Sequence, residues 1–483
     1  MGFASIQRLV GILLALFSLC MVPPIAVSVI YADGAATPFI ATLVLLFAGG
    51  LSLWWPVRKV RREMRLRDGF VIVVLFWTAL GVSGGLPLFL AHHPEMSLTD
   101  AVFESMSGLT TTGATVLTGL DTMPKSILFY RQMLQWLGGM GIIVLAVAIM
   151  PMLGIGGMQL FRAETPGPMK DDKLTPRITE TARALWYIYV TLTGLCTLGY
   201  WFAGMSVFDA VGHAFSTIST GGFSTHDASM AYFESAAVEA VCIVFMAVSA
   251  MNFALHFAAW RGRRVDHYLQ NEEWRFFLFV LVFVTVVTSL VLYLAEAYES
   301  LGQSVRYAVF QTVSISTSTG LTTTSFVTWP TFAPVLLLFA SFIGGCAFST
   351  GGGLKVIRVL LLLKQGVREI TRLVHPSAQV AIKVGGSFMP DRVMDSVWGF
   401  FAAYVGVFVI LMLSVMATGL DQVTAFSGVA ACLNNLGPGL GDVHFNYGDI
   451  NSTAKWLLTA AMLLGRLEVF TVLVILSPAF WRR

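Results

Sequence analysis

The chain has 483 residues, of which 56% are hydrophobic and only 12% are charged, and its formal net charge is +3 at pH 7. A soluble chain carries about 25% charged residues, so this composition excludes an ordinary soluble globular protein. Runs of about 20 apolar residues recur from end to end, which predicts an all-α integral membrane protein with many spans.

The apolar runs fall into two length classes. Full spans are expected at residues 6–30, 37–56, 69–91, 126–152, 182–204, 235–260, 275–297, 332–363, 394–418 and 455–480. Half-length spans are expected at 99–110, 206–217, 304–315 and 422–432, with Asp100, Ser206 and Asp421 as candidate N-caps. The Pro23-Pro24 pair predicts a kink or an interruption in the first span.

Lysine and arginine residues are concentrated in alternate loops. Six of them lie between residues 58 and 67, whereas the opposite loops hold little beyond Lys125, Arg131, Arg306 and Lys455. The positive-inside rule therefore places the basic loops and both termini in the cytoplasm. Each unit of span, half-span and span then begins and ends on the same side, which predicts parallel repeats rather than inverted ones.

This topology predicts a specific division of the chain. Four parallel helix–pore-loop–helix repeats are expected around one pseudo-four-fold pore, preceded by two extra transmembrane helices. The expected boundaries are 1–67 for the extra helices and 68–165, 166–270, 271–380 and 381–483 for the repeats, with the intramembrane gate loop in the third.

Each half-span leads into a short glycine-centred segment rich in hydroxyl or amide side chains. The residues expected to line the path are Thr111, Thr112 and Gly113; Thr220 and Gly221; Ser318, Thr319 and Gly320; and Asn435, Leu436 and Gly437. Irregular polar backbone is tolerated in a membrane only where it lines a water-filled path or is buried in protein. Glycine accepts the dihedrals that turn carbonyls inward, and rings of carbonyls replace the hydration shell of potassium.

The alternative is that these small residues merely allow close helix packing. That interpretation explains one segment well, but it explains four segments at matching places poorly. We therefore predict a filter that surrounds a dehydrated cation in transit.

Three strings carry a resemblance to a known family. They read Phe-Glu-Ser-Met-Ser-Gly-Leu-Thr-Thr-Thr-Gly-Ala-Thr at 103–115, His-Ala-Phe-Ser-Thr-Ile-Ser-Thr-Gly-Gly-Phe-Ser-Thr at 213–225 and Asn-Asn-Leu-Gly-Pro-Gly at 434–439. The chain resembles the TrkH family, the pore subunits of bacterial Trk potassium transporters, over essentially its whole length. Compared with the potassium-channel filter Thr-Val-Gly-Tyr-Gly, each segment keeps only its central glycine, so weaker discrimination against sodium is expected.

The resemblance also implies partners and a location. It implies potassium uptake through one pore per subunit, in a homodimer, in the bacterial inner membrane. It further implies a TrkA-like cytosolic nucleotide-binding ring that controls opening. No nucleic acid partner is expected.

The span after the third segment contains a run of glycines, namely Gly344, Gly345, Gly351, Gly352 and Gly353. Each costs a helix about 1 kcal/mol relative to alanine, so the stretch is expected to unwind near mid-membrane. It lacks the Gly-Lys-Ser/Thr ending of a phosphate-binding loop, so no nucleotide site is expected in this chain. Two interpretations stay open: a movable gate, which is also the role that the resemblance assigns, or a fixed, tightly packed crossing.

Arg466 lies inside the last span, where a cation is costly and is expected to face the pore or a polar partner. We expect it to impede cations below the filter and to contact the gate, and the resemblance matches it with the family's pore arginine. The alternative is an ion pair with Glu104 or Asp209. Lys355 and Arg358 follow the gate and either meet the regulatory partner or anchor the helix at the interface.

Two other classes of function require features that the sequence lacks. A secondary symporter predicts inverted repeats and paired carboxylates at the midplane, although proton coupling through the same pore stays open. An enzyme needs a catalytic constellation, whereas the intramembrane acids Glu104, Asp209 and Glu468 occur singly and the cysteines form no CxxC or Cys/His cluster. The chain is therefore not expected to be an enzyme.

Overall fold

The computed structural model describes residues 3–60, 66–141 and 178–482. Within these ranges the fold is built from helices, and the exception is a short antiparallel hairpin of β1 (Lys383–Val384) and β2 (Ser387–Phe388). Five helical spans are long and apolar enough to cross a membrane, and two further pairs qualify as bent spans. The predicted helical membrane class is thus confirmed.

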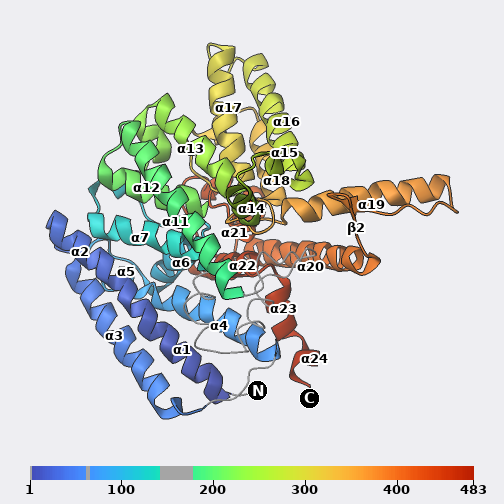
Figure 1. Ribbon diagram of the computed structural model, residues 1–483. Coiled ribbons are helices and arrows are strands. Elements are labelled where there is room, and N and C mark those ends of the chain that lie inside the picture. The colour runs from blue at the N-terminus through green and yellow to red at the C-terminus, as the bar shows by residue number, and fades with distance from the viewer. Residues whose placement is uncertain (1–2, 61–65, 142–177, 483) are drawn as a thin grey trace.

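Three N-terminal helices form two spans that pack together along one side of the molecule (Figure 1). They are α1 (Phe3–Ser18), α2 (Val22–Tyr31) and α3 (Ala36–Trp54). A 3-10 turn at Leu19–Met21 interrupts the first span just before the two prolines, as their fixed φ predicts. The α1 and α3 backbones approach closely because Gly11 has no side chain; a Cβ atom there would lie only 2.7 Å from the carbonyl oxygen of Gly50.

The other helices fall, in chain order, into a first set before residue 271 and a second set after it. The first set is α4 (Leu66–Ser83), α5 (Leu86–Phe89), α6 (Leu98–Leu109), α7 (Lys125–Gly139), α11 (Ile178–Phe202), α12 (Val207–Ser219), α13 (Ala236–Ser249), α14 (Phe253–Gly262) and α15 (Asp266–Gln270). The second set is α16 (Glu272–Leu294), α17 (Leu301–Ser316), α18 (Phe332–Ile343), α19 (Val356–Val374), α20 (Asp391–Met416), α21 (Gln422–Leu433), α22 (Ser452–Arg466), α23 (Phe470–Leu476) and α24 (Pro478–Trp481).

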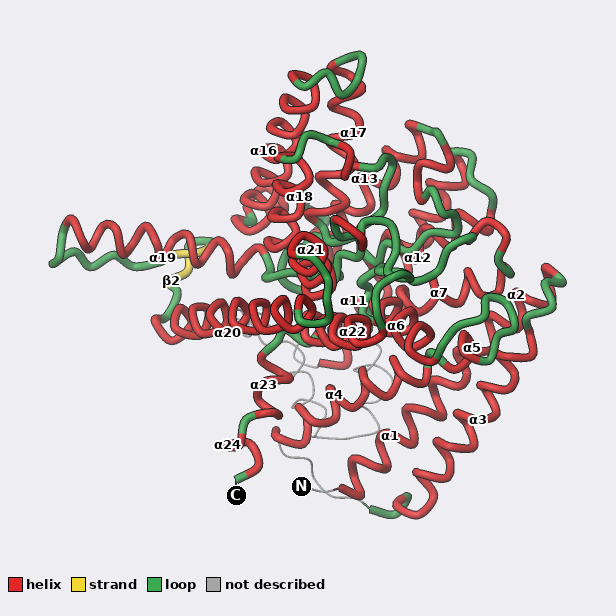
Figure 2. Tube along the Cα trace, turned by 180° about the vertical axis from the view of Figure 1, so that it is seen from behind, coloured by secondary structure: helices red, strands yellow, loops and turns green. Residues whose placement is uncertain are grey.

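Four short helices, α6, α12, α17 and α21, correspond to the predicted half-spans. Their N-caps are Ser97, Ser206, Ser300 and Asp421, whose side chains accept backbone N–H groups of the first turn. Two of the three predicted caps are confirmed, but Asp100 is wrong because it lies inside the first turn and donates its N–H to Ser97. The C-terminal halves of these helices are buried, and the loops that follow them gather in the middle of the molecule (Figure 2).

Three further expected full spans are broken. The glycine run separates α18 from α19, as predicted. The spans expected at 235–260 and 455–480 are wrong as continuous helices, because α13 meets α14 at 93° and α22 meets α23 at 111°. Asn252 caps a new helix at the first bend, and Glu468 and Val469 adopt positive φ angles of 53° and 50° at the second.

Two predictions fall partly outside the described residues. The expected span at 126–152 is described only as far as 141, and the boundary between 165 and 166 is not described. Arg131 and Lys455, which we assigned to outer loops, lie instead within α7 and α22 and are buried.

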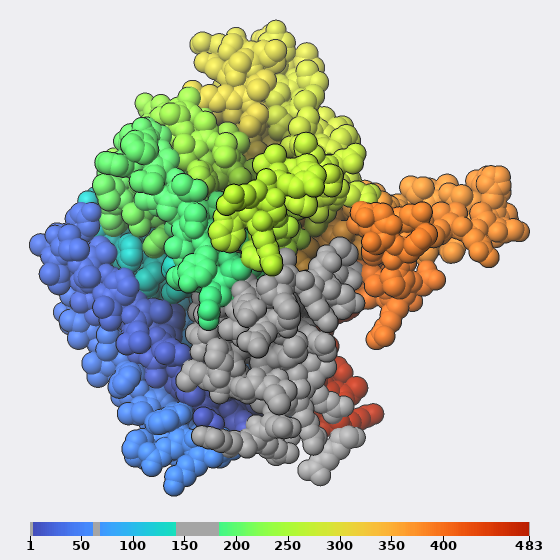
Figure 3. Space-filling model, in the orientation of Figure 1, coloured from blue at the N-terminus to red at the C-terminus, as the bar shows by residue number. Residues whose placement is uncertain are grey.

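A long arm projects from the body of the molecule. It consists of α19, the β1–β2 hairpin and the adjoining part of α20, shown in orange (Figures 1 and 3). Its outer helix, α19, carries apolar side chains that are more than half exposed, at Leu363, Val367, Ile370 and Val374.

Candidate functional site

The four glycine-centred segments that follow α6, α12, α17 and α21 have one backbone conformation. We call them segments 1 to 4. Each has a left-handed residue followed two positions later by a glycine with positive φ; the pairs are Thr111 (56°) and Gly113 (81°), Thr220 (54°) and Gly222 (86°), Ser318 (56°) and Gly320 (82°), and Asn435 (52°) and Gly437 (96°). The N–H of the intervening residue bonds the carbonyl five positions earlier, at distances of 2.8, 2.8, 2.8 and 2.7 Å in Thr112, Gly221, Thr319 and Leu436. The repetition is therefore at the level of dihedrals and hydrogen bonds.

The segments meet in a closed ring. A Cβ atom at Gly113 would lie 2.2 Å from the carbonyl oxygen of Gly221, which belongs to the next segment. The same relation continues from Gly222 to Thr319 (2.1 Å), from Gly320 to Leu436 (2.1 Å) and from Gly437 back to Thr112 (2.7 Å). Because side chains cannot occupy these positions, each glycine allows two backbones to approach, and the carbonyls of the four intervening residues lie at the four joints.

One predicted glycine was misplaced. The sequence predicts Gly221 as the central glycine of segment 2, but Gly222 has the positive φ and occupies the place of Gly113, Gly320 and Gly437. Gly221 instead occupies the place of Thr112, Thr319 and Leu436. Because Gly221 and Gly222 are adjacent, the sequence carries no signal that selects Gly222, and the dihedral angles identify it.

Polar side chains at one shared position hold the chain as it leaves three of the segments. This position is Glu104 on α6, His213 on α12 and Gln311 on α17, each seven residues before the left-handed residue. Glu104 accepts from the hydroxyl of Thr115 (2.9 Å) and the N–H of Val116 (2.9 Å). His213 Nε2 bonds Ser224 Oγ (2.9 Å), and Gln311 donates to the carbonyl of Thr324 (3.1 Å).

Glu104 is also part of a buried ion pair. Arg131 Nε lies 2.7 Å from its carboxylate, and both side chains are at most 1% exposed. The guanidinium donates to the carbonyl of Ser224 (3.3 Å) as well, so it joins the chain after segment 1 to the chain after segment 2. Such a pair is costly to break because one charge is then left buried.

The glycine-rich crossing, residues 344–355, lies against the ring. The N–H of Gly352 donates to Ser318 Oγ at 2.5 Å, and the Thr220 hydroxyl of segment 2 donates to Thr350 Oγ1 at 3.3 Å. A Cβ atom at Gly352 would lie 2.0 Å from the carbonyl oxygen of Asn434, and one at Gly351 would lie 2.9 Å from that of Thr317. A Cβ at Gly344 would lie 2.1 Å from the carbonyl of Gly352, and Gly345 and Gly353 lie in this turn. The crossing thus touches segments 2, 3 and 4.

Arg466 adds the contact to segment 1. Its guanidinium donates to Thr111 Oγ1 (3.2 Å), to the Thr350 carbonyl of the crossing (3.0 Å) and to the Gly138 carbonyl at the end of α7 (2.6 Å). The two acids weighed as its partners are engaged elsewhere, Glu104 with Arg131 and Asp209 with Ser206, Thr225 and His226. Arg466 therefore links the ring to the crossing.

Two cations, one at the end of the crossing and one in the first turn of α19, face inward. The ammonium of Lys355 donates to the carbonyl of Gly351. Arg358 forms an ion pair with Glu468 (2.5 Å) at the bend between α22 and α23, and its guanidinium lies 4.1 Å from the centre of the Phe400 ring. The Arg358 contacts tie the start of α19, directly after the crossing, to the last repeat.

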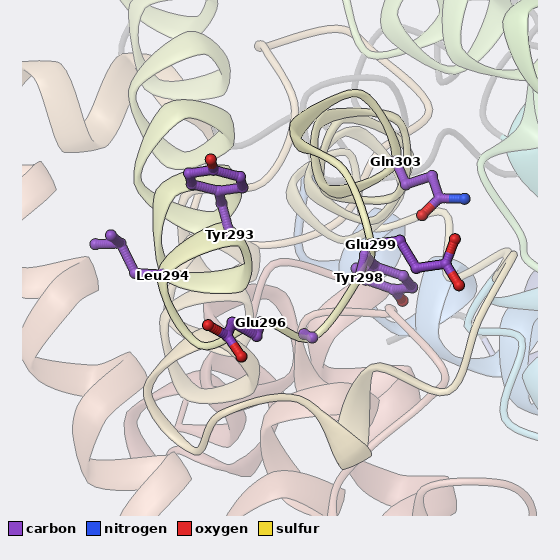
Figure 4. A pocket seen from close by; sticks show the side chains of 7 residues that line it. Tyr293, Leu294, Glu296, Tyr298, Glu299 and Gln303 are labelled. Carbon is purple, nitrogen blue, oxygen red and sulfur yellow. The ribbon is translucent and has the colours of Figure 1, made fainter.

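A surface hollow elsewhere does not belong to this site. It lies between the end of α16 and the start of α17 and is lined by residues such as Tyr293, Glu296, Tyr298 and Glu299 (Figure 4). None of its lining residues belongs to the four segments or the crossing. Among the described residues, no group of three or more His, Cys, Asp or Glu side chains is placed to hold a metal ion.

Comparison with known proteins agrees with this geometry. Residues 36–483 match the family model described as TrkH, cation transport protein. The chain is 59% identical to the Trk system potassium uptake protein TrkH of Vibrio parahaemolyticus and 55% identical to that of Escherichia coli, over 100% of each chain. It is 42% identical to TrkG of Escherichia coli over 99% of this chain and 98% of that one. The crystal structure of the potassium transporter TrkH from Vibrio parahaemolyticus superposes with a TM-score of 0.91 at 57% identity, covering 100% of both chains.

Proposed function

The chain belongs to the TrkH family of cation transport proteins, and from that premise we propose that it conducts potassium ions into a bacterial cell through the ring of four segments. The observation that carries the proposal is the closed cycle of glycine and carbonyl contacts from segment 1 to segment 4. A ring of backbone oxygens replaces the hydration shell of a dehydrated cation. The transported potassium ion is the substrate, and the function is transport rather than catalysis.

In this proposal the four short helices stabilise the ion through their backbone dipoles. Each ends at its segment, and a helix C-terminus carries a partial negative charge of about half an electron. Thr111, Thr220, Ser318 and Asn435 begin the filter, which ends at Gly113, Gly222, Gly320 and Gly437. Four parallel repeats with the boundaries given above, inner-membrane location and cytoplasmic termini complete the proposed topology.

We assign the gate to residues 344–355 and Arg466. The crossing contacts three segments and Arg466 contacts the fourth, so movement of the crossing would disturb the entire ring. A positive charge roughly 8 Å from a permeating cation costs about 2 kcal/mol at an effective dielectric constant of about 20. Arg466 would accordingly hold the path closed while the crossing lies beneath the ring.

Two partners are part of the proposal. The exposed apolar side chains of α19 recur at spacings of four, three and four residues, which forms one helical stripe suited to a second copy of the chain. We propose a homodimer that buries this stripe. A TrkA-like nucleotide-binding ring is proposed on the cytoplasmic side, consistent with relatives that are named as members of a Trk system.

Flux into liposomes tests the proposal. The purified protein should admit potassium and rubidium faster than sodium, down the potassium gradient and the voltage, whereas a symporter would need a second ion gradient. Empty liposomes set the background. Equal rates for all three ions, or no flux above background, would overturn the filter.

The gate is tested in the same preparation. Arg466→Ala should raise potassium flux about 30-fold because a repulsion of about 2 kcal/mol is removed, and shortening the crossing should also raise it. Arg275→Ala, which removes an exposed arginine at the start of α16, is the matched control and should leave flux unchanged. If potassium flux is unchanged both in folded Arg466→Ala and in the variant with the shortened crossing, a fixed crossing is favoured.

A further inference from the structure

Segment 2 lacks a support that segments 1 and 3 possess. In segment 1 the hydroxyls of Thr110 and Thr112 are 2.8 Å apart, and in segment 3 those of Thr317 and Thr319 are 2.7 Å apart. Each pair links the residues on either side of the left-handed position. In segment 2 the second hydroxyl is missing because Gly221 has no side chain.

A side chain from another repeat occupies the vacated place. Gln135 on α7 is fully buried, and its Nε2 donates to the carbonyl oxygen of Gly221 at 2.6 Å. Its Oε1 accepts the N–H of Phe223 at 3.1 Å. A Cβ atom at Gly221 would lie 2.4 Å from Gln135 Cδ, so the glycine is what allows the amide to approach.

A second residue of α7 contacts the same stretch one helical turn away. Arg131 is four residues before Gln135, on the same face of the helix. It donates to the carbonyl of Ser224, and its guanidinium lies 4.2 Å from the centre of the Phe223 ring. Helix α7 therefore contacts residues 221–224 at two points, through Gln135 and Arg131, one helical turn apart.

We propose that Gln135 is a positioning residue that fixes the Gly221 carbonyl and thereby sets the ion preference of the ring. The inference rests on the proposed function, because it assigns a role in the same filter. Gly221 contributes the carbonyl at the joint between segments 1 and 2, where it faces Gly113. Both halves of the amide are used, one on that carbonyl and one on the N–H two residues later, so the peptide between them cannot rotate without breaking a hydrogen bond.

The consequence is a difference in rigidity that acts on sodium more than on potassium. A ring held at a fixed width coordinates potassium well and sodium poorly, whereas a ring with one loose carbonyl contracts around the smaller ion. Gln135 thus supplies from repeat 1 the restraint that the threonine pair supplies within segments 1 and 3.

The test compares two glutamines on the same helix. Gln135→Met keeps an unbranched side chain of similar length but removes both hydrogen bonds. Gln132→Met is the matched control, because Gln132 is also fully buried on α7 yet neither of its amide atoms has a hydrogen-bond partner among the described residues. Purified proteins in liposomes are assayed for potassium, rubidium and sodium flux.

We expect Gln135→Met to reduce the potassium-to-sodium flux ratio at least about fivefold, the effect of one lost hydrogen bond, with Gln132→Met unchanged. A folded Gln135→Met protein with the wild-type flux ratio would overturn the inference. Methionine fills the same space without the hydrogen bonds, so that result would show that Gln135 only fills space. An equal fall in both variants would overturn it too. If the wild-type protein passes no ions, the proposed function fails, which is a separate outcome.

A second variant approaches the contact from the other side and covers the case in which Gln135→Met does not fold. Gly221→Ala leaves the glutamine in place but displaces its amide, and Gly221 does not have a positive φ that alanine would resist. The flux ratio should fall as in Gln135→Met, and the double variant should show no further fall. An unaltered ratio in folded Gly221→Ala would contradict the inference.

Discussion

Segments 1 and 3 of the ring are stabilised internally, whereas segments 2 and 4 are stabilised by side chains from elsewhere. The threonine pairs bridge segments 1 and 3, but segment 2 depends on Gln135 of α7. In segment 4 the amide of Asn434 bonds Ser341 Oγ on α18 at 3.0 Å, and that of Asn435 bonds Thr112 Oγ1 in segment 1 at 2.9 Å. The backbone repeats four times although the supporting side chains do not.

The difference has a simple physical basis. The ion would meet main-chain oxygens, so only the backbone must be equivalent in the four segments. Side chains behind the backbone are free to differ as long as every carbonyl is held. The departures at Gly221 and Leu436, which weaken the repeat in sequence, mark the places where neighbouring repeats provide the support.

The strongest perturbation of this arrangement is predicted at Arg131. Arg131→Met leaves the carboxylate of Glu104 buried without its counter-ion and removes the link between the chains that leave segments 1 and 2. We expect a loss of about 3–5 kcal/mol in stability, measured by thermal or denaturant unfolding in detergent.

Arg306→Met is its matched control. Arg306 pairs with Glu239 at 2.7 Å; Glu239 is buried like Glu104, but the Arg306 side chain is 40% exposed, so water reaches the pair and the expected loss is smaller, about 1 kcal/mol. Equal losses in the two variants would show that burial of the Glu104 pair is not what matters.

The second largest effect is expected at the positive-φ glycines. Gly222→Ala places a Cβ 2.1 Å from the Thr319 carbonyl and imposes a left-handed conformation that costs alanine about 1–2 kcal/mol. Potassium flux should fall about tenfold or more. Gly437→Ala should be milder because its Cβ would lie 2.7 Å from the nearest oxygen. If Gly221→Ala lowered flux more than Gly222→Ala, our assignment of the shared glycine position would be wrong.

Much of the site was predictable because it is repeated. The half-span expected at 422–432 corresponds to α21, and the glycine run breaks the span after segment 3 as its low helix propensity predicts. The family was likewise predictable from the strings around segments 1, 2 and 4. Repetition allowed weak local signals to support one another.

The remaining features depend on tertiary contacts that occur once. Two adjacent glycines in segment 2 leave a one-residue ambiguity that only the dihedral angles resolve. The bend after Arg466 lacks a proline and coincides with the ion pair between Arg358 and Glu468, 110 residues apart. Arg131 was assigned to a loop because charge alone does not reveal that its partner, Glu104, lies 27 residues away on α6.

A smaller effect is predicted within the internally stabilised segments. Thr319→Val removes the hydroxyl that bonds Thr317, and Thr112→Val removes one that bonds both Thr110 and Asn435. We expect the potassium-to-sodium flux ratio to fall about fivefold for Thr319→Val, and further for Thr112→Val, because each buried hydrogen bond contributes about 1 kcal/mol. Ratios that fall only in Thr112→Val would mean that the contact between segments, rather than the threonine pair, provides the support.

The smallest effect concerns the outer loops that follow segments 1 and 2. His226 Nδ1 lies 2.5 Å from Asp121 and Nε2 lies 3.3 Å from Asp209, while its ring stacks on Tyr232 at 3.4 Å and faces His213 at 6.5 Å. Burial disfavours its charge, but the hydrogen bonds to Asp209 and Asp121 outweigh burial and raise the pKa of His226. Burial likewise opposes the charge of Asp121, yet the hydrogen bond to His226 holds its pKa below the usual value.

The sign of the pH effect follows from these two shifts. The folded protein binds the His226 proton more tightly than the unfolded chain, so this contribution is complete below about pH 6.5 and is lost as the pH rises through the folded pKa. The Asp121 contribution is present above about pH 4 and is lost as the pH falls through its own folded pKa. Raising the pH from 6 to 8 should thus lower the unfolding midpoint by about 1–2 °C, and His226→Gln should remove that part of the change. His375→Gln, at an exposed histidine after α19, should retain it. Because the loops lie beyond the ring, ion preference should not change with His226→Gln. A change in the potassium-to-sodium flux ratio would mean that the outer loops also stabilise segments 1 and 2.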